Sequence, residues 1–169
     1  MITPDDTTRI LMRVEHAMGA CTEIDEAAAT FMRVLQSEIP QVTWAGVYWL
    51  QAKELVLGPF SGPETEYVRI PMGDGICGTA AAEGTNRIVQ DVRLEDNYLA
   101  CSATTRSEIV VLIRDTFGGV LGLIDADSDQ VGGFDHTDEM LLEAVGTRLA
   151  AFVRRRSAAG RDADATGSD

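Results

Sequence analysis

Two cysteines are the residues of this sequence best suited to redox or nucleophilic chemistry. Cys77 lies in a glycine-rich turn at the start of an expected helix, where the helix dipole lowers the pKa of a thiol. The alternative role is packing in a tight turn. Cys101 lies in an expected long loop among small and polar residues, which favours an accessible thiol over a buried one. Cys21 follows an expected helix end and is assigned no role.

Three carboxylates form the second candidate group. Glu108 opens one strand of an expected hairpin, and Asp125 and Asp127 close the other. Side chains alternate along a strand, so Asp125 and Asp127 share a face, and a turn at residues 118–119 brings Glu108 to the same end. Like charges held close raise the pKa of at least one carboxyl group, which provides a proton donor while the others bind an ammonium group. Solvated strand ends are the alternative.

Other motifs are less specific. Trp44 and Tyr48 share one face of an expected strand and belong to the core or to a pocket wall. The glycines of residues 73–78 fit the dinucleotide-binding string, but no second βαβ unit accompanies them. The two histidines, His16 and His136, lie far apart, so we expect no metal site.

The elements that must position these residues follow from hydrophobic period and turn signals. Thr3 and Pro4 predict the start of a first helix, and a second is expected from Asp25 to before Pro40. Asp135 is expected to cap a final helix. Between them the pattern predicts strands at 42–50, 54–60, 67–70, 87–89, 108–113 and 120–126, a short helix from the 73–78 turn to Gly84, and a loop at 91–105.

This order predicts an α+β fold with a mainly antiparallel central sheet of about six strands, flanked by N- and C-terminal helices. We expect one domain over residues 1–158 and a disordered acidic tail at 159–169. A loop as long as 91–105 is often a lid or a binding loop.

Composition limits the partners. The chain has 169 residues, 27 acidic against 14 basic, and a formal net charge of −13. This charge argues against nucleic acid and favours a small-molecule or protein partner. The sequence lacks a signal-peptide pattern and an apolar run of the roughly 20 residues needed to span a membrane. Three cysteines, an odd number, favour reduced thiols, so we expect a cytoplasmic protein.

Taken together, these residues resemble the free methionine-(R)-sulfoxide reductase family, which are single GAF domains. The matching segments run in the family's order over residues 42–145, and the spacing of Cys77 and Cys101 also matches. They are Trp44-Ala45-Gly46-Val47-Tyr48, Leu57-Gly58-Pro59-Phe60, Val68-Arg69-Ile70-Pro71, Gly73-x-Gly75-Ile76-Cys77-Gly78-Thr79-Ala80, Asp91-Val92, Ala100-Cys101, Ser107-Glu108-Ile109-Val110 and Gly122-Leu123-Ile124-Asp125-x-Asp127-Ser128.

The resemblance implies thiol-dependent reduction of free methionine sulfoxide. It implies that Cys101 is the nucleophile and becomes a sulfenic acid, and that Cys77 resolves it as a disulfide. It assigns ammonium binding and proton donation to Glu108, Asp125 and Asp127. Trp44 would pack against the S-methyl end, and Tyr48 shares its strand face. No bound cofactor is implied, and the reductant would be thioredoxin or another thiol.

The sequence departs from the family pattern in three places. Tyr67 stands where the family has a cysteine before Val-Arg-Ile-Pro, Ser102 where it usually has aspartate, and Leu112 where it often has proline. The alternative function is therefore a GAF sensory or small-molecule-binding module with little turnover. A third alternative is a structural interaction protein that dimerises through its acidic surface or helices. The sequence leaves open whether the chain forms a homodimer.

Overall fold

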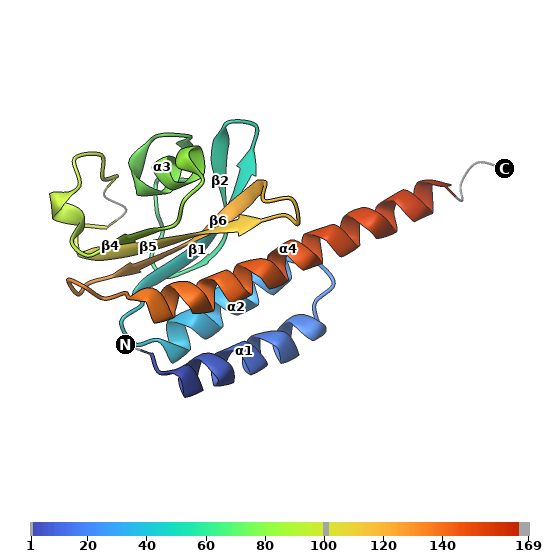
Figure 1. Cartoon of the computed structure of the whole chain (residues 1–169), viewed down its shortest axis with the longest axis horizontal. Helices are drawn as coiled ribbons and strands as arrows, with labels where there is room; N and C mark the ends of the chain where they lie inside the picture. The colour runs from blue at the N-terminus through green and yellow to red at the C-terminus, as the bar shows by residue number, and fades with distance from the viewer. Residues whose placement is uncertain (1, 100–101, 166–169) are drawn as a thin grey trace.

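The computed structural model describes residues 2–99 and 102–165. Four helices, six strands and one 3-10 turn follow one another along the chain (Figure 1). They are α1 (Pro4–Gly19), α2 (Ile24–Glu38), β1 (Trp44–Gln51), β2 (Glu54–Ser61), β3 (Arg69–Pro71), α3 (Gly75–Glu83), β4 (Arg87–Val89), the 3-10 turn (Val92–Leu94), β5 (Ser107–Arg114), β6 (Val120–Ser128) and α4 (His136–Ala165).

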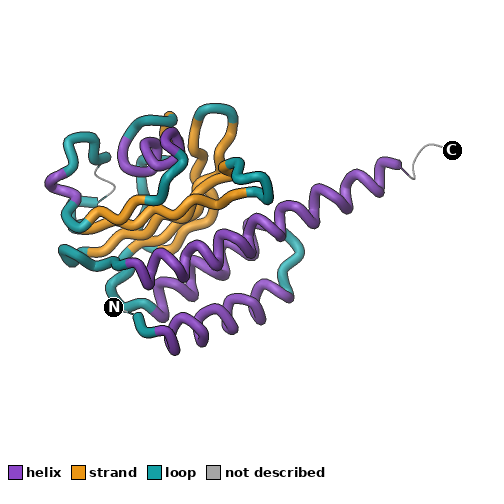
Figure 2. Tube along the Cα trace, viewed as in Figure 1, coloured by secondary structure: helices purple, strands orange, loops and turns teal. Residues whose placement is uncertain are grey.

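The strands form a single sheet in the order β3-β2-β1-β6-β5-β4. Every strand pair within the described residues is antiparallel. Helices α1, α2 and α4 cover one face, and the short helix α3 lies on the other (Figures 1 and 2). The predicted α+β architecture is confirmed, with one helix on the face opposite the N- and C-terminal helices.

Local capping explains where two helices begin. The Thr3 hydroxyl accepts a hydrogen bond from the backbone N–H of Asp6 (3.2 Å), and the Asp6 carboxylate accepts one from the backbone N–H of Thr3 (3.0 Å). This reciprocal box starts α1, with Pro4 in its first turn. The Asp135 carboxylate likewise accepts from the backbone of Thr137 and Asp138. Both predicted N-caps are confirmed.

Alternation along the central strands divides the interior into two clusters. Inward-facing residues such as Val47, Ile109 and Ile124 pack against the three long helices in an apolar core. The alternate side chains of these strands point to the other face, where Trp44, Tyr48 and Leu123 pack under α3 in a smaller cluster. The candidate carboxylates point to this second face as well. The sheet therefore separates a mainly apolar core under the three long helices from the layer that carries the candidate carboxylates.

Most strand boundaries lie within two residues of expectation, and two differences bear on the site and on the end of the described chain. Strand β6 extends to Ser128, so Asp127 lies within the strand and opposite a residue of β5. Helix α4 runs to Ala165 and so includes residues 159–165, for which the composition predicted a disordered tail. Alanine and arginine favour helix in this segment, and they outweigh its polarity. Within the described ranges, no helix has the length and apolarity required to cross a membrane.

Candidate active site

The register of two adjacent strands brings the candidate carboxylates together. Glu108 on β5 lies directly opposite Asp127 on β6. Asp125, two residues earlier on β6, lies opposite Val110 and therefore diagonal to Glu108. All three side chains are buried, with 2–4% of their surface exposed. The predicted convergence is present, but the alternative of solvated strand ends is wrong for these residues.

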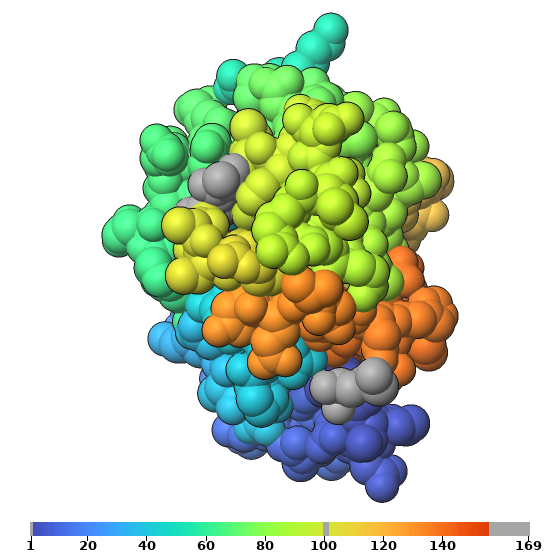
Figure 3. Space-filling model, turned by 90° about the vertical axis from the view of Figure 1, so that its left-hand side faces the viewer, coloured from blue at the N-terminus to red at the C-terminus, as the bar shows by residue number. Residues whose placement is uncertain are grey.

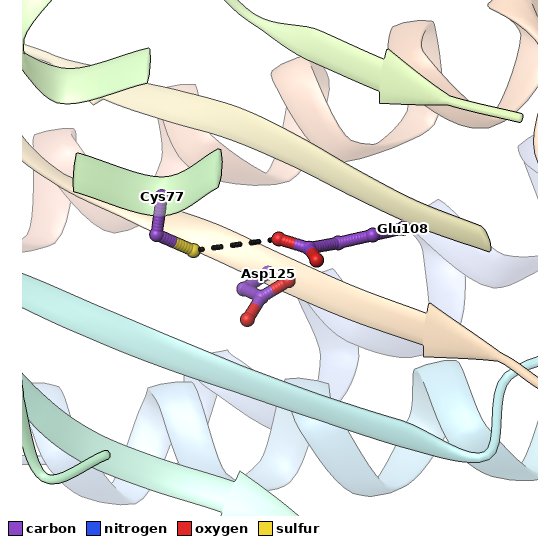
Figure 4. A group of neighbouring side chains, drawn as sticks. All are labelled: Cys77, Glu108 and Asp125. Carbon is purple, nitrogen blue, oxygen red and sulfur yellow. Dashed lines mark hydrogen bonds between the residues drawn. The ribbon is translucent and has the colours of Figure 1, made fainter. Parts of the chain in front are cut away.

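Helix α3 adds Cys77 to this group (Figure 4). The Cys77 thiol donates a hydrogen bond to Glu108 Oε1, with a distance of 3.8 Å between sulfur and oxygen. Gly78 lets the start of α3 pack against the end of β3, because a Cβ there would collide with the Pro71 carbonyl oxygen. The thiol is buried and forms no disulfide with another described cysteine. The sequence predicted that Cys77 lies at the start of a helix, but it did not predict that a carboxylate faces the thiol.

Burial dominates the electrostatics of the carboxylates. Burial first, and then the charges of Asp125 and Asp127, raise the pKa of Glu108 well above its ordinary value. Burial and the charge of Asp127 likewise raise the pKa of Asp125. Burial raises the pKa of Asp127 to about 7, against a hydrogen bond from Thr105 that lowers it. The predicted direction is confirmed, although desolvation and not like charge is the larger cause.

One carboxylate oxygen has an unmet hydrogen-bonding capacity. Asp125 Oδ1 is buried and has no hydrogen-bond partner among the described residues. An unpartnered buried oxygen costs free energy, because it has lost its contact with water. A ligand that donates hydrogen bonds, above all a cation, would remove that cost. The group is therefore suited to bind an ammonium ion.

Trp44 forms the aromatic border of the site. Its ring stacks on Phe60 with 5.8 Å between centroids, and its indole N–H donates to the Pro63 carbonyl at 3.0 Å. The ring extends over Gly46, where a Cβ would collide with it. Since Trp44 lies opposite Asp127 and Gly46 opposite Asp125, the indole stands beside the acidic group.

A small cavity opens between the indole and Asp127. It has a volume of about 50 Å³ and lies between β1 and residues 102–105. Its walls are Thr43, Trp44, Pro63, Glu64, Ser102, Thr104, Thr105 and Asp127. This volume is comparable to one or two water molecules at roughly 30 Å³ each.

Comparisons with known proteins agree with this geometry. A free methionine-R-sulfoxide reductase of Saccharomyces cerevisiae is 40% identical over 135 residues, which cover 78% of this chain and 72% of that protein. No protein-family model matches the chain. The chain belongs to the free methionine-R-sulfoxide reductase family.

Solved structures place the fold of this reductase in the GAF class. The structure of the Neisseria meningitidis free methionine-R-sulfoxide reductase in complex with its substrate superimposes with a TM-score of 0.84 at 32% identity, covering 93% of this chain and 96% of that one. A solved GAF domain superimposes with a TM-score of 0.81 at 31% identity over 87% of this chain and 86% of the other. The GAF-like fold inferred from the resemblance is confirmed.

The other residues singled out from the sequence are Tyr48 and the cysteines Cys101 and Cys21. Tyr48 is fully buried and its hydroxyl donates to the Tyr67 carbonyl at 2.8 Å, so it holds the segment before β3. Its role in binding a substrate stays a prediction. Cys101 lies outside the described residues. The thiol of Cys21 donates to the Ala17 carbonyl within α1, far from the site.

Two residues that border the site were not identified from the sequence. Thr105 donates to Asp127 from a loop without any periodic pattern, so no signal identified it. Gly46 provides the space for the indole, and the signal was a glycine within an aromatic strand, which often marks a close approach of another group.

The site also has donor atoms suited to a metal ion. Sγ of Cys77 and carboxylate oxygens of Glu108 and Asp125 all lie within 4.8 Å of one another. One thiol and two carboxylates fit a divalent ion such as zinc, provided the thiol loses its proton. The expectation of no metal in this chain stays a prediction.

Proposed function

We propose that this protein reduces free methionine-(R)-sulfoxide to methionine at the expense of thiols. The observation that supports the proposal best is the buried group of Glu108, Asp125 and Asp127 beside the Trp44 indole. Membership of the reductase family supports the reaction class, and the group supplies what such a substrate needs. The substrate has one ammonium group, one apolar methyl end and one oxygen that must be protonated.

Substrate binding follows from the charges of the site. The ammonium group of a free amino acid would donate to Asp125 Oδ1, the oxygen without a partner. Its positive charge would lower the pKa of the nearest carboxyl groups and let them ionise. The S-methyl end would pack on the indole of Trp44. A peptide-bound residue has an amide in place of the ammonium group, so the site would reject it.

Reduction requires a nucleophile and a proton donor. The Cys101 sulfur would attack the sulfoxide sulfur while a protonated carboxyl group, Glu108 in our assignment, gives a proton to the oxygen. The oxygen ends on Cys101 as a sulfenic acid, and methionine leaves. The methionine sulfur gains two electrons and the cysteine sulfur loses two.

Regeneration would use the second cysteine. The Cys77 thiol would condense with the sulfenic acid to form a disulfide and release water. A thioredoxin-like dithiol then supplies two electrons and restores both thiols. Restoring both thiols requires a reducing compartment, which supports the expectation of a cytoplasmic location.

Two substrate comparisons test the proposal. The protein should reduce the free R epimer with a thioredoxin system or dithiothreitol and leave the S epimer unchanged. N-acetylation of the substrate removes the ammonium charge and should abolish turnover. Equal rates on the free and N-acetylated epimers would show that the carboxylates do not recognise the amine.

Cysteine variants test the chemistry. Cys101→Ser should be inactive with either reductant, and Cys77→Ser should lose thioredoxin-linked turnover but keep activity with dithiothreitol. Cys21→Ser is the matched control and should behave as the wild type. Full activity of Cys101→Ser together with an inactive Cys77→Ser would reverse the two roles.

A further inference from the structure

Three buried side chains from three different elements converge on one point. Cys77 comes from α3, Glu108 from β5 and Asp125 from β6. The sulfur of Cys77 and one carboxylate oxygen from each of the two acids lie within 4.8 Å of one another. Figure 4 shows the three side chains pointing toward one another. The fold therefore holds one sulfur and two oxygens around a common centre.

The acidic side chains here lack a positive partner. No ion pair between described residues involves Glu108, Asp125 or Asp127. The Cys77 thiol has one proton, a weak donor, for the two carboxylates with which it interacts. Asp125 is 2% exposed, and its Oδ1 accepts no hydrogen bond from the described residues. A buried oxygen left in this state costs free energy, which a cation would recover.

Residues 92–99 cover part of this group. Val92 and Leu99 pack in the same cluster as Cys77, and a Cβ at Gly75, the first residue of α3, would collide with the Leu99 side chain. Figure 3 shows this segment, in yellow-green, on the surface at one end of the molecule. Because the carboxylates beneath are withdrawn from bulk water, their attraction to a cation is stronger than at an exposed site.

The separations suit a small divalent ion. The centre of three atoms that lie within 4.8 Å of one another is no further than about 2.8 Å from each, and zinc bonds are about 2.3 Å to sulfur and about 2.0–2.2 Å to carboxylate oxygen. Bonds of these lengths at a tetrahedral angle place sulfur and oxygen about 3.6 Å apart, close to the 3.8 Å between Cys77 Sγ and Glu108 Oε1. Side-chain shifts of less than about 1 Å therefore complete the coordination.

The donor atoms indicate which ion. Magnesium and calcium take oxygen ligands, whereas a thiolate favours zinc, which also accepts carboxylates. Three protein ligands leave the fourth tetrahedral position of zinc open. The expectation of no metal rested on the distance between the two histidines. It did not weigh a set made of one cysteine and two carboxylates.

We propose that Cys77, Glu108 and Asp125 bind a zinc ion, and that this ion reversibly inhibits sulfoxide reduction. The thiol gives its proton to solvent as the zinc–sulfur bond forms, and no atom changes its oxidation state. The ion occupies the carboxylate that receives the substrate ammonium, the carboxyl group that donates the proton and the thiol that resolves the sulfenic acid. Inhibition rests on the proposed function, whereas binding does not.

Titration of the metal-free full chain with cobalt(II) tests the binding site. Cobalt replaces zinc in such sites, and a cobalt–thiolate bond gives an ultraviolet charge-transfer band that carboxylates do not give. We expect a band that saturates at one cobalt per chain and disappears when zinc is added. Cys77→Ala should lack the band, and Cys21→Ser and Cys101→Ser should retain it. Absence of the band in the wild type, or its retention in Cys77→Ala, would overturn the proposal.

Competition with a zinc-binding dye measures the contribution of each ligand. Cys77→Ala should weaken zinc binding by more than about 100-fold, since even a contact outside the coordination shell is worth about 10–100-fold. Asp125→Asn keeps the shape of the side chain and should weaken binding at least about tenfold. Asp129→Asn removes an exposed charge beyond the end of β6 and is the matched control, with wild-type affinity. Equal affinity of Asp125→Asn and the wild type contradicts the site.

A single-turnover assay tests the inhibition. The reduced chain, freed of external thiol, is mixed with free methionine-(R)-sulfoxide, and the methionine formed is measured by chromatography. Saturating zinc should abolish methionine formation, and a chelator should restore it. Equal methionine with and without zinc would overturn the inhibitory role. No methionine from the metal-free chain would instead contradict the proposed function, while the cobalt titration of Cys77→Ala decides the zinc site independently.

Discussion

At the scale of single residues, Glu108 is the carboxyl group best placed to give a proton. Burial and two neighbouring carboxylates raise its pKa well above its ordinary value, against a hydrogen bond from Cys77 that lowers it. Glutamine has nearly the same shape but has no proton to give. We therefore expect Glu108→Gln to lower kcat by about 10²–10⁴-fold, the usual cost of losing a general acid.

The control for this change is Glu95→Gln. Glu95 is exposed and influences Glu108 only through its charge. Its replacement should leave kcat within about twofold of wild type, because solvent screens an exposed charge. Steady-state assays with dithiothreitol measure both variants. Wild-type kcat in Glu108→Gln would transfer the donor role to Asp125 or Asp127.

Asp127 should make stability depend on pH. Its pKa rises from 3.8 to about 7 on folding, so between these values the folded protein holds a proton that the unfolded chain releases. Stability from this group is complete below pH 4 and is lost as the pH rises to 7. Its upper limit is about 4 kcal/mol, from about three pKa units at roughly 1.4 kcal/mol each.

Asp127→Asn removes this group from titration. Urea unfolding at pH 5 and pH 8 should show that the variant gains stability relative to wild type at the higher pH. Asp129→Asn, two residues away and exposed, should follow the wild-type slope. Parallel pH dependence of Asp127→Asn and wild type would contradict a protonated Asp127 in the folded state.

At the scale of elements, strand β1 makes room for the indole because residue 46 has no side chain. A Cβ at Gly46 would collide with the Trp44 ring. Gly46→Ala should displace the indole, and a loss of about 1.4 kcal/mol of binding corresponds to a tenfold rise in KM. The fold should survive with a modestly lowered Tm. Gly19→Ala is the control, because a Cβ there meets no atom within 4 Å. Unchanged KM in Gly46→Ala would show that the indole does not contact the substrate.

The elements themselves were largely predictable from local signals. Thr3, Pro4 and Asp135 revealed helix starts because capping depends on neighbouring residues alone. Period-two alternation placed Asp125 and Asp127 on one face, and the hairpin turn brought Glu108 to them. The family resemblance added which chemistry such a group serves.

Contacts between distant segments were beyond such signals. The approach of Cys77 to Glu108 depends on how α3 packs over the sheet, which no local pattern encodes. The same holds for Thr105 beside Asp127. The end of α4 differs for another reason, because the small and polar residues after residue 158 indicate disorder by composition, whereas the helix continues to Ala165.

At the scale of the whole molecule, α4 extends well past the sheet and the other helices (Figure 1). A chain ending at Arg155 would lose only the projecting part. If that part has no partner, the free energy of unfolding should change by less than about 1 kcal/mol, which is a Tm shift of at most about 2–4 °C. Calorimetry and sedimentation on both chains measure this. A larger loss, or a fall in molecular mass beyond the deletion, would instead support a homodimer formed through α4.

The division of the sheet into an apolar face and an acidic face also bears on how accurately the chain folds. A strand that pairs one residue out of step turns every side chain to the opposite face. For β6 such a slip would push Asp125 and Asp127 among the long helices and expose Ile124 to the site. Two carboxylates without partners in an apolar layer would cost far more than a mispaired hydrophobic residue. The acidic residues therefore penalise the wrong register during assembly, before any substrate has been bound.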